Sequence, residues 1–293
     1  MAEELALVVD VNVEGRARLK EYEHVRFLGK GAYGEEHKAT GKRVAIKEVS
    51  REKYQDGVNI AAVKELQVLT ELDHPNCLRM LDVFFLNDRV NLVIDLAKTD
   101  LKAVVSTRSI KYTEAHAKTL IQDMLRGLAA MHAAGFLHRD VKPDNCLLDG
   151  DGVLKVADFG LAAPIPEGRK AQHPQLLTQW YRPPELCMGA RHYGPAVDVW
   201  AAGCVAAEVL TRRPLLQAAE EGNAAQVKEI WRVLGTPTEE AWPGHALLPG
   251  WAPPKRTIPA PAWPSIVPRV TPQATDLLSK MLALNPASRV SME

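Results

Sequence analysis

The chain has 293 residues, 46% of them hydrophobic, and its 36 lysines and arginines balance 36 acidic side chains. This composition fits a globular protein with room for a large core or two lobes, and it excludes a disordered or collagen-like chain. A formal net charge of zero gives no electrostatic sign of nucleic-acid or membrane binding, so we expect neither partner.

The cysteines and the chain start indicate a reducing compartment. The four cysteines contain no C-x-x-C pair, which predicts neither a zinc site nor a disulfide framework. The N-terminus lacks the basic segment of a signal peptide, and the most apolar long stretch, residues 197–210, carries acidic residues and is too short to span a membrane. We therefore expect a soluble intracellular protein.

Two regions of different pattern follow an N-terminal extension, residues 1–21. Residues 22–97 contain short β-rich runs at 43–47 and 90–94 and one helical run at 59–72, which predicts a small sheet lobe. Residues 98–293 become helical from Thr113, which can cap a helix that Gly135 ends. The expected fold class is α+β, with a β-rich N-terminal lobe and a larger α-helical C-terminal lobe.

Residues 237–268 form a proline-rich insert. They hold nine of the 20 prolines, which prevents regular helix or sheet over most of the stretch. We expect a surface loop that docks a partner, such as a small adaptor protein. After the insert, only residues 271–284 have a helical pattern.

The residues from Gly29 to Gly34 form a G-x-G-x-x-G string, which is a weak signal alone because it also opens dinucleotide-binding helices. Here a short hairpin, turned at residues 40–42, follows the string, so the loop joins two strands. A glycine-rich loop between strands can lie over phosphates as a flap, and a plain glycine-rich hairpin is the alternative.

Lys47 and Glu65 form a candidate ion pair. Lys47 ends an apolar strand, where an ammonium group is costly unless paired, and Glu65 follows 18 residues later in the helical run. Most such pairs are structural, so this pair alone does not establish a catalytic role.

The motifs His138-Arg139-Asp140-Val141-Lys142-Pro143-Asp144-Asn145 and Asp158-Phe159-Gly160 decide the interpretation. With them the sequence resembles the eukaryotic protein kinases from about residue 22 to residue 289, with each motif in the expected order. The resemblance implies the bilobal protein-kinase fold and a reaction that uses ATP and Mg²⁺.

The resemblance also implies roles for individual residues. Asp140 would accept the proton of the attacking hydroxyl, and Lys142 and Thr178 would steady that carboxylate in the manner of a serine/threonine kinase. Lys47 would hold the α- and β-phosphates while Glu65 holds Lys47, and Asn145 and Asp158 would bind Mg²⁺. The nucleotide would contact Leu28, Gly29, Gly31, Gly34, Glu36, Ala45, Lys47, Ile94, Asp95, Ala97, Asp100 and Leu147.

Other matching residues have structural roles in the family. His138 would pack in the core with Phe159, Leu69 and Met80. A buried pair of Glu185 and Arg289 would support the substrate shelf, and Asp198 would bind the backbone near His138.

Within the protein kinases the sequence is similar to the cyclin-dependent kinase family. Trp180-Tyr181-Arg182 and the proline-rich insert resemble the branch that holds the cyclin-dependent and MAP kinases. Within it, short runs such as 56–59, 74–76, 189–191 and 234–240 look most like the CDK-activating kinase, and residues 272–274 resemble the cell-cycle-related kinase, which comes second. The resemblance implies Ser/Thr-Pro protein substrates, a cyclin-type activating partner near Asn59–Glu65, and a location in the nucleus or cytoplasm. An ordinary amphipathic helix explains that segment equally well.

Three departures from the family pattern stand out. Glu36 replaces an apolar residue above the adenine, and a lost apolar contact there costs about 1–3 kcal/mol of binding. Residues 161–177 contain no Ser, Thr or Tyr, and His173 takes the place of the activating Thr. Of the three expected phosphate-binding arginines only Arg139 is present, with Lys64 and Ala163 at the other positions. The family's last helix is also missing after Glu293, which leaves open whether the chain continues.

Two functions therefore compete. The first is an active kinase that does not depend on activation-loop phosphorylation, because every residue that would contact phosphate or metal is present. The second is a pseudokinase scaffold with weak or no activity, which Glu36 and the unphosphorylatable loop favour.

Overall fold

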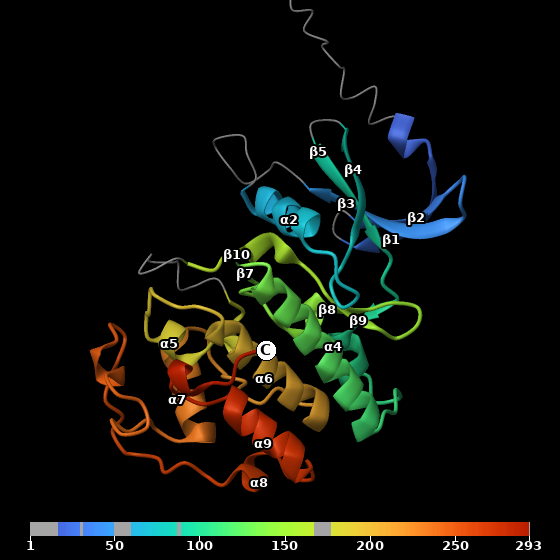
Figure 1. Cartoon of the computed structure of the whole chain (residues 1–293). Coiled ribbons are helices and arrows are strands. Elements are labelled where there is room, and N and C mark those ends of the chain that lie inside the picture. Colours follow the sequence, from blue (N-terminus) through green and yellow to red (C-terminus); the bar gives the residue numbers. More distant parts are fainter. Residues whose placement is uncertain (1–16, 30–31, 50–59, 87–88, 167–176, 293) are drawn as a thin grey trace, which may run out of the picture.

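The chain folds into a small lobe built on a five-stranded sheet and a larger lobe built mainly from helices (Figure 1). The structure is a computed structural model that describes residues 17–29, 32–49, 60–86, 89–166 and 177–292. The expected α+β fold with a β-rich N-terminal lobe and a helical C-terminal lobe is confirmed.

The sheet of the small lobe is antiparallel, with the strand order β1-β2-β3-β5-β4. Val44 and Ile46 on β3 pack in a small core on one face, whereas Ala45 between them joins the main core, as the two-residue period of a strand requires. The strands are β1 (Tyr22–Gly29), β2 (Ala32–His37), β3 (Lys42–Val49), β4 (Met80–Leu86) and β5 (Arg89–Asp95).

Helix α2 (Ile60–Glu71) connects β3 to β4 and agrees with the predicted helical run. Strand β3 continues to Val49, so Lys47 lies inside the strand rather than at its end, because both Lys47 and Val49 pair with β5. The turn between β2 and β3 contains Gly41 with φ of 65°, a left-handed conformation that glycine adopts without steric cost.

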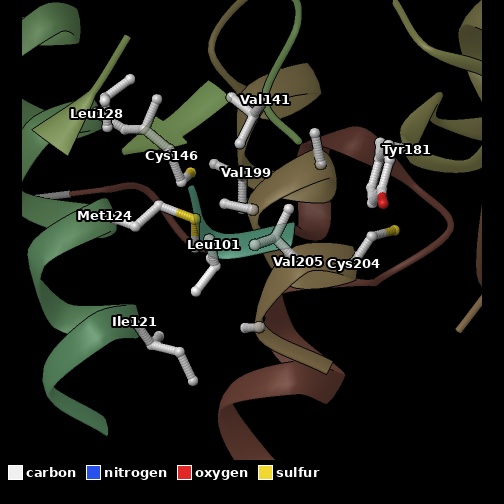
Figure 2. Packing of buried hydrophobic residues seen from close by; sticks show 14 of the residues in the cluster. Leu101, Ile121, Met124, Leu128, Val141, Cys146, Tyr181, Val199, Cys204 and Val205 are labelled. Carbon is white, nitrogen blue, oxygen red and sulfur yellow. The ribbon is translucent and has the colours of Figure 1, made fainter. Parts of the chain in front are cut away.

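Helices α4 and α6 form the centre of the large lobe. Thr113 caps α4 and Gly135 follows it, as predicted. Figure 2 shows Met124 and Leu128 of α4 facing Val199 and Val205 of α6 across the buried core. The helices are α3 (Leu101–Ser106), α4 (Glu114–Ala133), α5 (Pro184–Cys187), α6 (Ala196–Thr211), α7 (Asn223–Leu234), α8 (Trp263–Ile266) and α9 (Pro272–Met281).

Short strands and 3-10 turns complete the large lobe. They include the sheet β6-β8-β9, the pair β10-β7, and turns that carry the kinase-like motifs. The strands are β6 (Thr99–Asp100), β7 (Phe136–Leu137), β8 (Cys146–Leu148), β9 (Leu154–Val156) and β10 (Ala163–Pro164), and the 3-10 turns are η1 (Pro143–Asn145), η2 (Phe159–Leu161), η3 (Gln179–Tyr181), η4 (His245–Leu247) and η5 (Pro286–Ser288).

The proline-rich insert is mostly irregular, as its composition predicts. It contains only the turn η4 and the four-residue helix α8, and buried Trp242 and His245 anchor it to the lobe. No helix within the described ranges is long and apolar enough to cross a membrane.

All four cysteines are buried and unpaired. Burial raises the pKa of the Cys77, Cys146 and Cys187 thiols to about 12, and it raises the pKa of Cys204 as well. The four thiols therefore stay protonated at neutral pH.

Candidate active site

Lys47 and Glu65 form the predicted ion pair between β3 and α2. The Lys47 Nζ donates to Glu65 Oε1 at 2.8 Å and to Oε2 at 3.1 Å, and Asp158 Oδ1 lies 3.9 Å from the same nitrogen. Burial favours the neutral amine, but the charges of Glu65 and Asp158 outweigh it and raise the pKa of Lys47. Lys47 is therefore a fixed cation on the inner face of the small lobe.

Asp140 lies at the centre of a second group, on the loop between β7 and η1. Its Oδ1 accepts from the Thr178 hydroxyl at 2.8 Å, and its Oδ2 accepts from Lys142 Nζ at 2.5 Å and from Asn145 Nδ2 at 3.0 Å. Lys142 also reaches the Thr178 hydroxyl at 3.3 Å. The structure thus brings three predicted residues together around the carboxylate of a fourth, Asp140.

Asn145 and Asp158 provide oxygen atoms for a cation. The Asn145 amide nitrogen donates to the Asp140 carbonyl at 2.9 Å and to its carboxylate at 3.0 Å, so the amide oxygen is the atom that could bind a metal. Asp158 adopts a left-handed conformation with φ of 63°, and its side chain is about half exposed, at 52%. A carboxylate and an amide oxygen are the hard ligands that Mg²⁺ prefers, so this donor set fits the expected metal.

His138 is a core residue, as predicted. Its side chain is fully buried, its ring lies edge-on to Phe159 with centroids 5.7 Å apart, and its Nε2 bonds the Ala157 carbonyl at 3.0 Å. Leu69 of α2 belongs to the same core and Met80 of β4 packs against it. The aromatic pair thus links the motif turn η2 to the small lobe.

Asp198 of α6 holds the loop that carries Asp140. Its two oxygens accept the backbone N–H groups of His138 and Arg139, both at 2.8 Å, which matches the expected role. His132 adds a contact to Asp198 Oδ2 at 2.9 Å that sequence reasoning missed. Burial would raise the pKa of Asp198, but these partners lower it, so the carboxylate is ionised.

Arg139 bonds the start of the segment after Asp158. Its Nε donates to the Leu161 carbonyl at 2.7 Å, and its other nitrogens reach the Ala162 carbonyl and the Tyr193 hydroxyl, both at 3.4 Å. Burial, followed by the charge of Arg139, lowers the pKa of nearby Lys64. His173, the residue at the expected phosphorylation position, lies outside the described residues.

Three of the expected nucleotide-contacting residues lie on the sheet and on β8: Ala45 on β3, Ile94 on β5 and Leu147 on β8. Ala45 and Ile94 are buried sheet partners, and Leu147 on β8 is half-buried. Asp100 caps α3, because its Oδ1 accepts from Ala103 N at 2.7 Å. Asp95 ends β5, and Ala97 lies in the segment that connects β5 to β6 between the two lobes.

The glycine-rich loop is only partly described. Gly29 ends β1 and Gly34 lies on β2, whereas Gly31 and the Leu28 side chain lie outside what the structure describes. Glu36 faces Arg43 across β2 and β3, with Arg43 Nε 3.5 Å from Glu36 Oε2. The carboxylate side chain is 41% exposed, so it avoids the cost of burial by pairing at the rim.

Glu185 of α5 and Arg289 form the predicted buried pair. The Arg289 guanidinium donates to both oxygens of Glu185, at 2.6 and 2.7 Å, with both side chains almost fully buried. Guanidinium and carboxylate match in this two-bond geometry, which is the strongest form of such a pair.

Sequence reasoning missed a polar network around Arg182 and Gln179. Arg182 bonds the Leu177 carbonyl through two nitrogens, and its third reaches Asn223 Oδ1 at 2.5 Å. Gln179 bonds the Glu220 carbonyl at 2.8 Å and accepts from Gly222 N at 3.0 Å. The partners lie about 41 residues apart, so no spacing rule could have found them.

The two-lobed fold, the paired Lys47 and the fixed carboxylate of Asp140 define a protein kinase. A family model described as the protein kinase domain matches residues 22–293. The chain is 42% identical to cyclin-dependent kinase D-1 of Arabidopsis thaliana over 91% of its length and 67% of that protein. It is 43% identical to cyclin-dependent kinase 7 of Xenopus laevis over 82% of its length and 69% of that protein.

A solved structure resembles the whole chain. It is the CAK complex of Chaetomium thermophilum bound to ATP-γ-S, with a TM-score of 0.90, 34% identity, and coverage of 97% of this chain and 92% of that one. The chain belongs to the protein kinase family and, within it, to the serine/threonine cyclin-dependent kinases of the type of cyclin-dependent kinase 7.

Proposed function

We propose that this chain transfers the γ-phosphate of Mg·ATP to Ser/Thr-Pro sites in proteins, with a cyclin-type activator and without activation-loop phosphorylation. The observation that carries the proposal is the carboxylate of Asp140, held by Lys142, Thr178 and Asn145 within 3.0 Å. A carboxylate fixed in this way can orient a hydroxyl nucleophile and accept its proton.

The other residues of the site neutralise charge. Mg²⁺ and ATP, when bound, supply the transferable phosphoryl group and screen its charge. Asn145 and Asp158 offer oxygens to the metal, and Lys47, kept in place by Glu65, offers a cation to the phosphates. Phosphoryl transfer needs mainly alignment and electrostatic stabilisation, which this set provides.

Arg182 supports the preference for proline after the target residue. Its guanidinium engages the Leu177 carbonyl, so that carbonyl is not available to a substrate N–H. A proline has no N–H to leave unsatisfied, whereas any other residue at that position would lose a hydrogen bond. Asn223 keeps Arg182 in this orientation.

The outer side of α2 supports a protein activator. Val63 on this helix is 51% exposed, although it is a large apolar side chain, within the segment 59–65 where a partner was expected. A cyclin-type protein covering this face would fix α2 and the Lys47–Glu65 pair. We extend the proposal to a small adaptor on the proline-rich insert and to a nuclear or cytoplasmic location.

A pseudokinase scaffold is the second candidate, and Glu36 is the observation that favours it. The Glu36 carboxylate stands on the same face of the sheet as Ala45 and pairs with Arg43. With Glu36 in place of an apolar side chain above the adenine, the nucleotide loses an apolar contact.

Two measurements on the purified chain separate the candidates. The first is ATP affinity with Mg²⁺ for the natural chain, Glu36→Val and Arg43→Gln. The second is phosphate transfer to paired peptide libraries, Ser/Thr-Pro and Ser/Thr-Ala, with and without a cyclin, using Asp140→Asn as the blank. Arg43→Gln is the matched control, because it breaks the ion pair without adding an apolar contact.

Transfer that requires Asp140 and favours proline by at least tenfold would support the proposed kinase. We expect Glu36→Val to tighten ATP binding about tenfold and Arg43→Gln to leave it unchanged. Absence of nucleotide binding and of transfer, with a cyclin present, would support the scaffold instead. Transfer without a preference for proline would contradict the assigned role of Arg182.

A further inference from the structure

A basic cavity lies in the large lobe, in the region of α7 and α8 in Figure 1. Its volume is about 1000 Å³, and it is bounded by the end of α6, the segment that follows, the end of α7 and residues 261–269. Four arginines line it, Arg212, Arg213, Arg232 and Arg269, and no acidic residue does. No residue of the candidate active site contributes to its wall.

Two of these arginines have free guanidinium groups. Within the described part of the chain, Arg213 and Arg269 make no side-chain hydrogen bond or ion pair, and both are exposed. Arg232 is paired with its neighbour Glu229 at 2.7 Å but remains 67% exposed. Arg213 and Arg269 therefore give this side of the cavity two cations without an ion-pair partner among the described residues, which favours an anion there.

Arg212 is held in place by contacts outside the cavity. One of its nitrogens donates to the carbonyls of Val104, Thr107 and Ile110, at 3.0, 3.3 and 2.7 Å, and the guanidinium lies 4.5 Å from the Tyr112 ring centroid. Its buried Nε has no partner among the described residues. The carbonyl contacts hold this cation in place at the cavity wall, and a fixed cation favours an anionic ligand.

The backbone at two of the arginines is unusual. Among the described non-glycine residues only four have positive φ, and two of them, Arg139 and Asp158, belong to the active site. The other two are Arg212, with φ of 59°, and Arg269, with φ of 71°, and both line this cavity. Left-handed backbone at non-glycine residues is costly and concentrates at functional sites.

We propose that this cavity binds a phosphorylated serine or threonine of a protein segment. Guanidinium groups match phosphate through paired hydrogen bonds, and several together suit a dianion better than a single carboxylate. The cavity is far larger than a phosphate ion, and Leu215, Val233 and Ile266 in its wall offer contacts to the neighbouring residues of a peptide. The site is independent of the proposed catalytic function and separate from its residues.

The test measures peptide binding to the purified full chain at constant salt, with a non-hydrolysable ATP analogue and Mg²⁺ saturating the active site. The probes are a degenerate peptide library with a central phosphoserine, the same library with serine, and inorganic pyrophosphate. The variants are Arg213→Gln and Arg269→Gln, with Arg256→Gln, an exposed arginine outside the cavity, as the matched control.

We expect the chain to bind peptides of the phosphoserine library and not those of the serine library. Arg213→Gln and Arg269→Gln should each weaken retention at least tenfold, because each removes a charge-assisted contact, whereas Arg256→Gln should change it less than twofold. Equal behaviour of the two libraries, or unaffected binding in both cavity variants, would overturn the proposal. Binding of pyrophosphate without binding of phosphopeptides would also overturn it, because the cavity would then accept only free anions.

Discussion

At the residue scale, the carboxylate of Asp140 is restrained at both oxygens. Thr178 bonds one oxygen, while Lys142 and Asn145 bond the other. The carboxylate therefore has little freedom to rotate before a substrate arrives. Preorganisation of this kind reduces the reorganisation needed during reaction.

Because the Thr178 hydroxyl bonds the Asp140 carboxylate, we expect it to position that carboxylate, and Thr178→Ala should lower kcat for peptide phosphorylation about tenfold to a hundredfold. ATP affinity should change less than twofold, because Thr178 contacts Asp140 and Lys142. Steady-state kinetics and equilibrium ATP binding measure both effects. Thr178→Ser keeps the hydroxyl and should restore most of kcat; an equally low rate in this variant would contradict the positioning role.

Asp198 makes the free energy of unfolding depend on pH in the acid range. Its pKa is lower in the folded chain than in the unfolded chain, where it is about 3.9. The stabilisation is therefore complete above about pH 5 and declines as the pH falls through 3.9 towards the folded-state value. His132 and the two backbone N–H groups are the partners that would be lost on protonation.

We expect Asp198→Asn to reduce the free energy of unfolding by on the order of 2–4 kcal/mol at pH 7, since it removes a buried, hydrogen-bonded charge. The difference from the natural chain should narrow as the pH falls below about 4. Urea unfolding at several pH values measures it. A difference that stays constant down to pH 3 would show that ionisation of Asp198 is not the cause.

At the element scale, Arg139 holds the beginning of the activation segment through backbone contacts. Its guanidinium bonds the Leu161 and Ala162 carbonyls, which are present whatever the phosphorylation state. Residues 161–177 contain no hydroxyl side chain. The order of this segment near Arg139 therefore does not require an added phosphate.

Phosphatase treatment should leave kcat/KM for a Ser/Thr-Pro peptide within twofold of the untreated value. The physical reason is that no phosphate in residues 161–177 can be removed. Kinetics before and after treatment, with mass spectrometry to follow the phosphate content, measure this. A loss of more than tenfold would mean that phosphorylation elsewhere controls activity.

The elements that carry the motifs could be predicted from the sequence, but a short helix and several residues that contact these elements could not. Lys47, Asp140 and Asp158 stand in motifs whose residue types the chemistry restricts, and helix α4 has a long apolar period with a capping threonine. The short helix α3 was missed because six residues give too little periodicity. His132 and Asn223 were missed because they are ordinary polar residues whose partners lie far along the chain.

At the scale of the whole molecule, the Glu185–Arg289 pair joins segments 104 residues apart. Arg289 also bonds the Ala196 carbonyl at the start of α6 and lies over the Trp200 ring. The pair therefore connects α5, the central helix α6 and the last described residues. Replacing one of the two residues by a neutral one would leave the charge of the other buried and unpaired.

Arg289→Met should lower the free energy of unfolding by about 3–5 kcal/mol, and Glu185→Gln should also destabilise strongly. The double variant should be less destabilised than the sum of the two, because neither charge is then left alone. Urea unfolding of the four proteins measures the coupling. Simple additivity would mean that the two side chains act independently.

The buried, protonated cysteines have a consequence for covalent chemistry. Electrophilic reagents attack thiolates, and none of the four thiols of this chain is exposed or acidified. Cysteine-directed inhibitors therefore have no target on the folded chain. Conversely, a cysteine introduced at the surface, for example at Val63 of α2, would be the single reactive site and could carry a fluorophore that reports binding of the proposed cyclin-type partner.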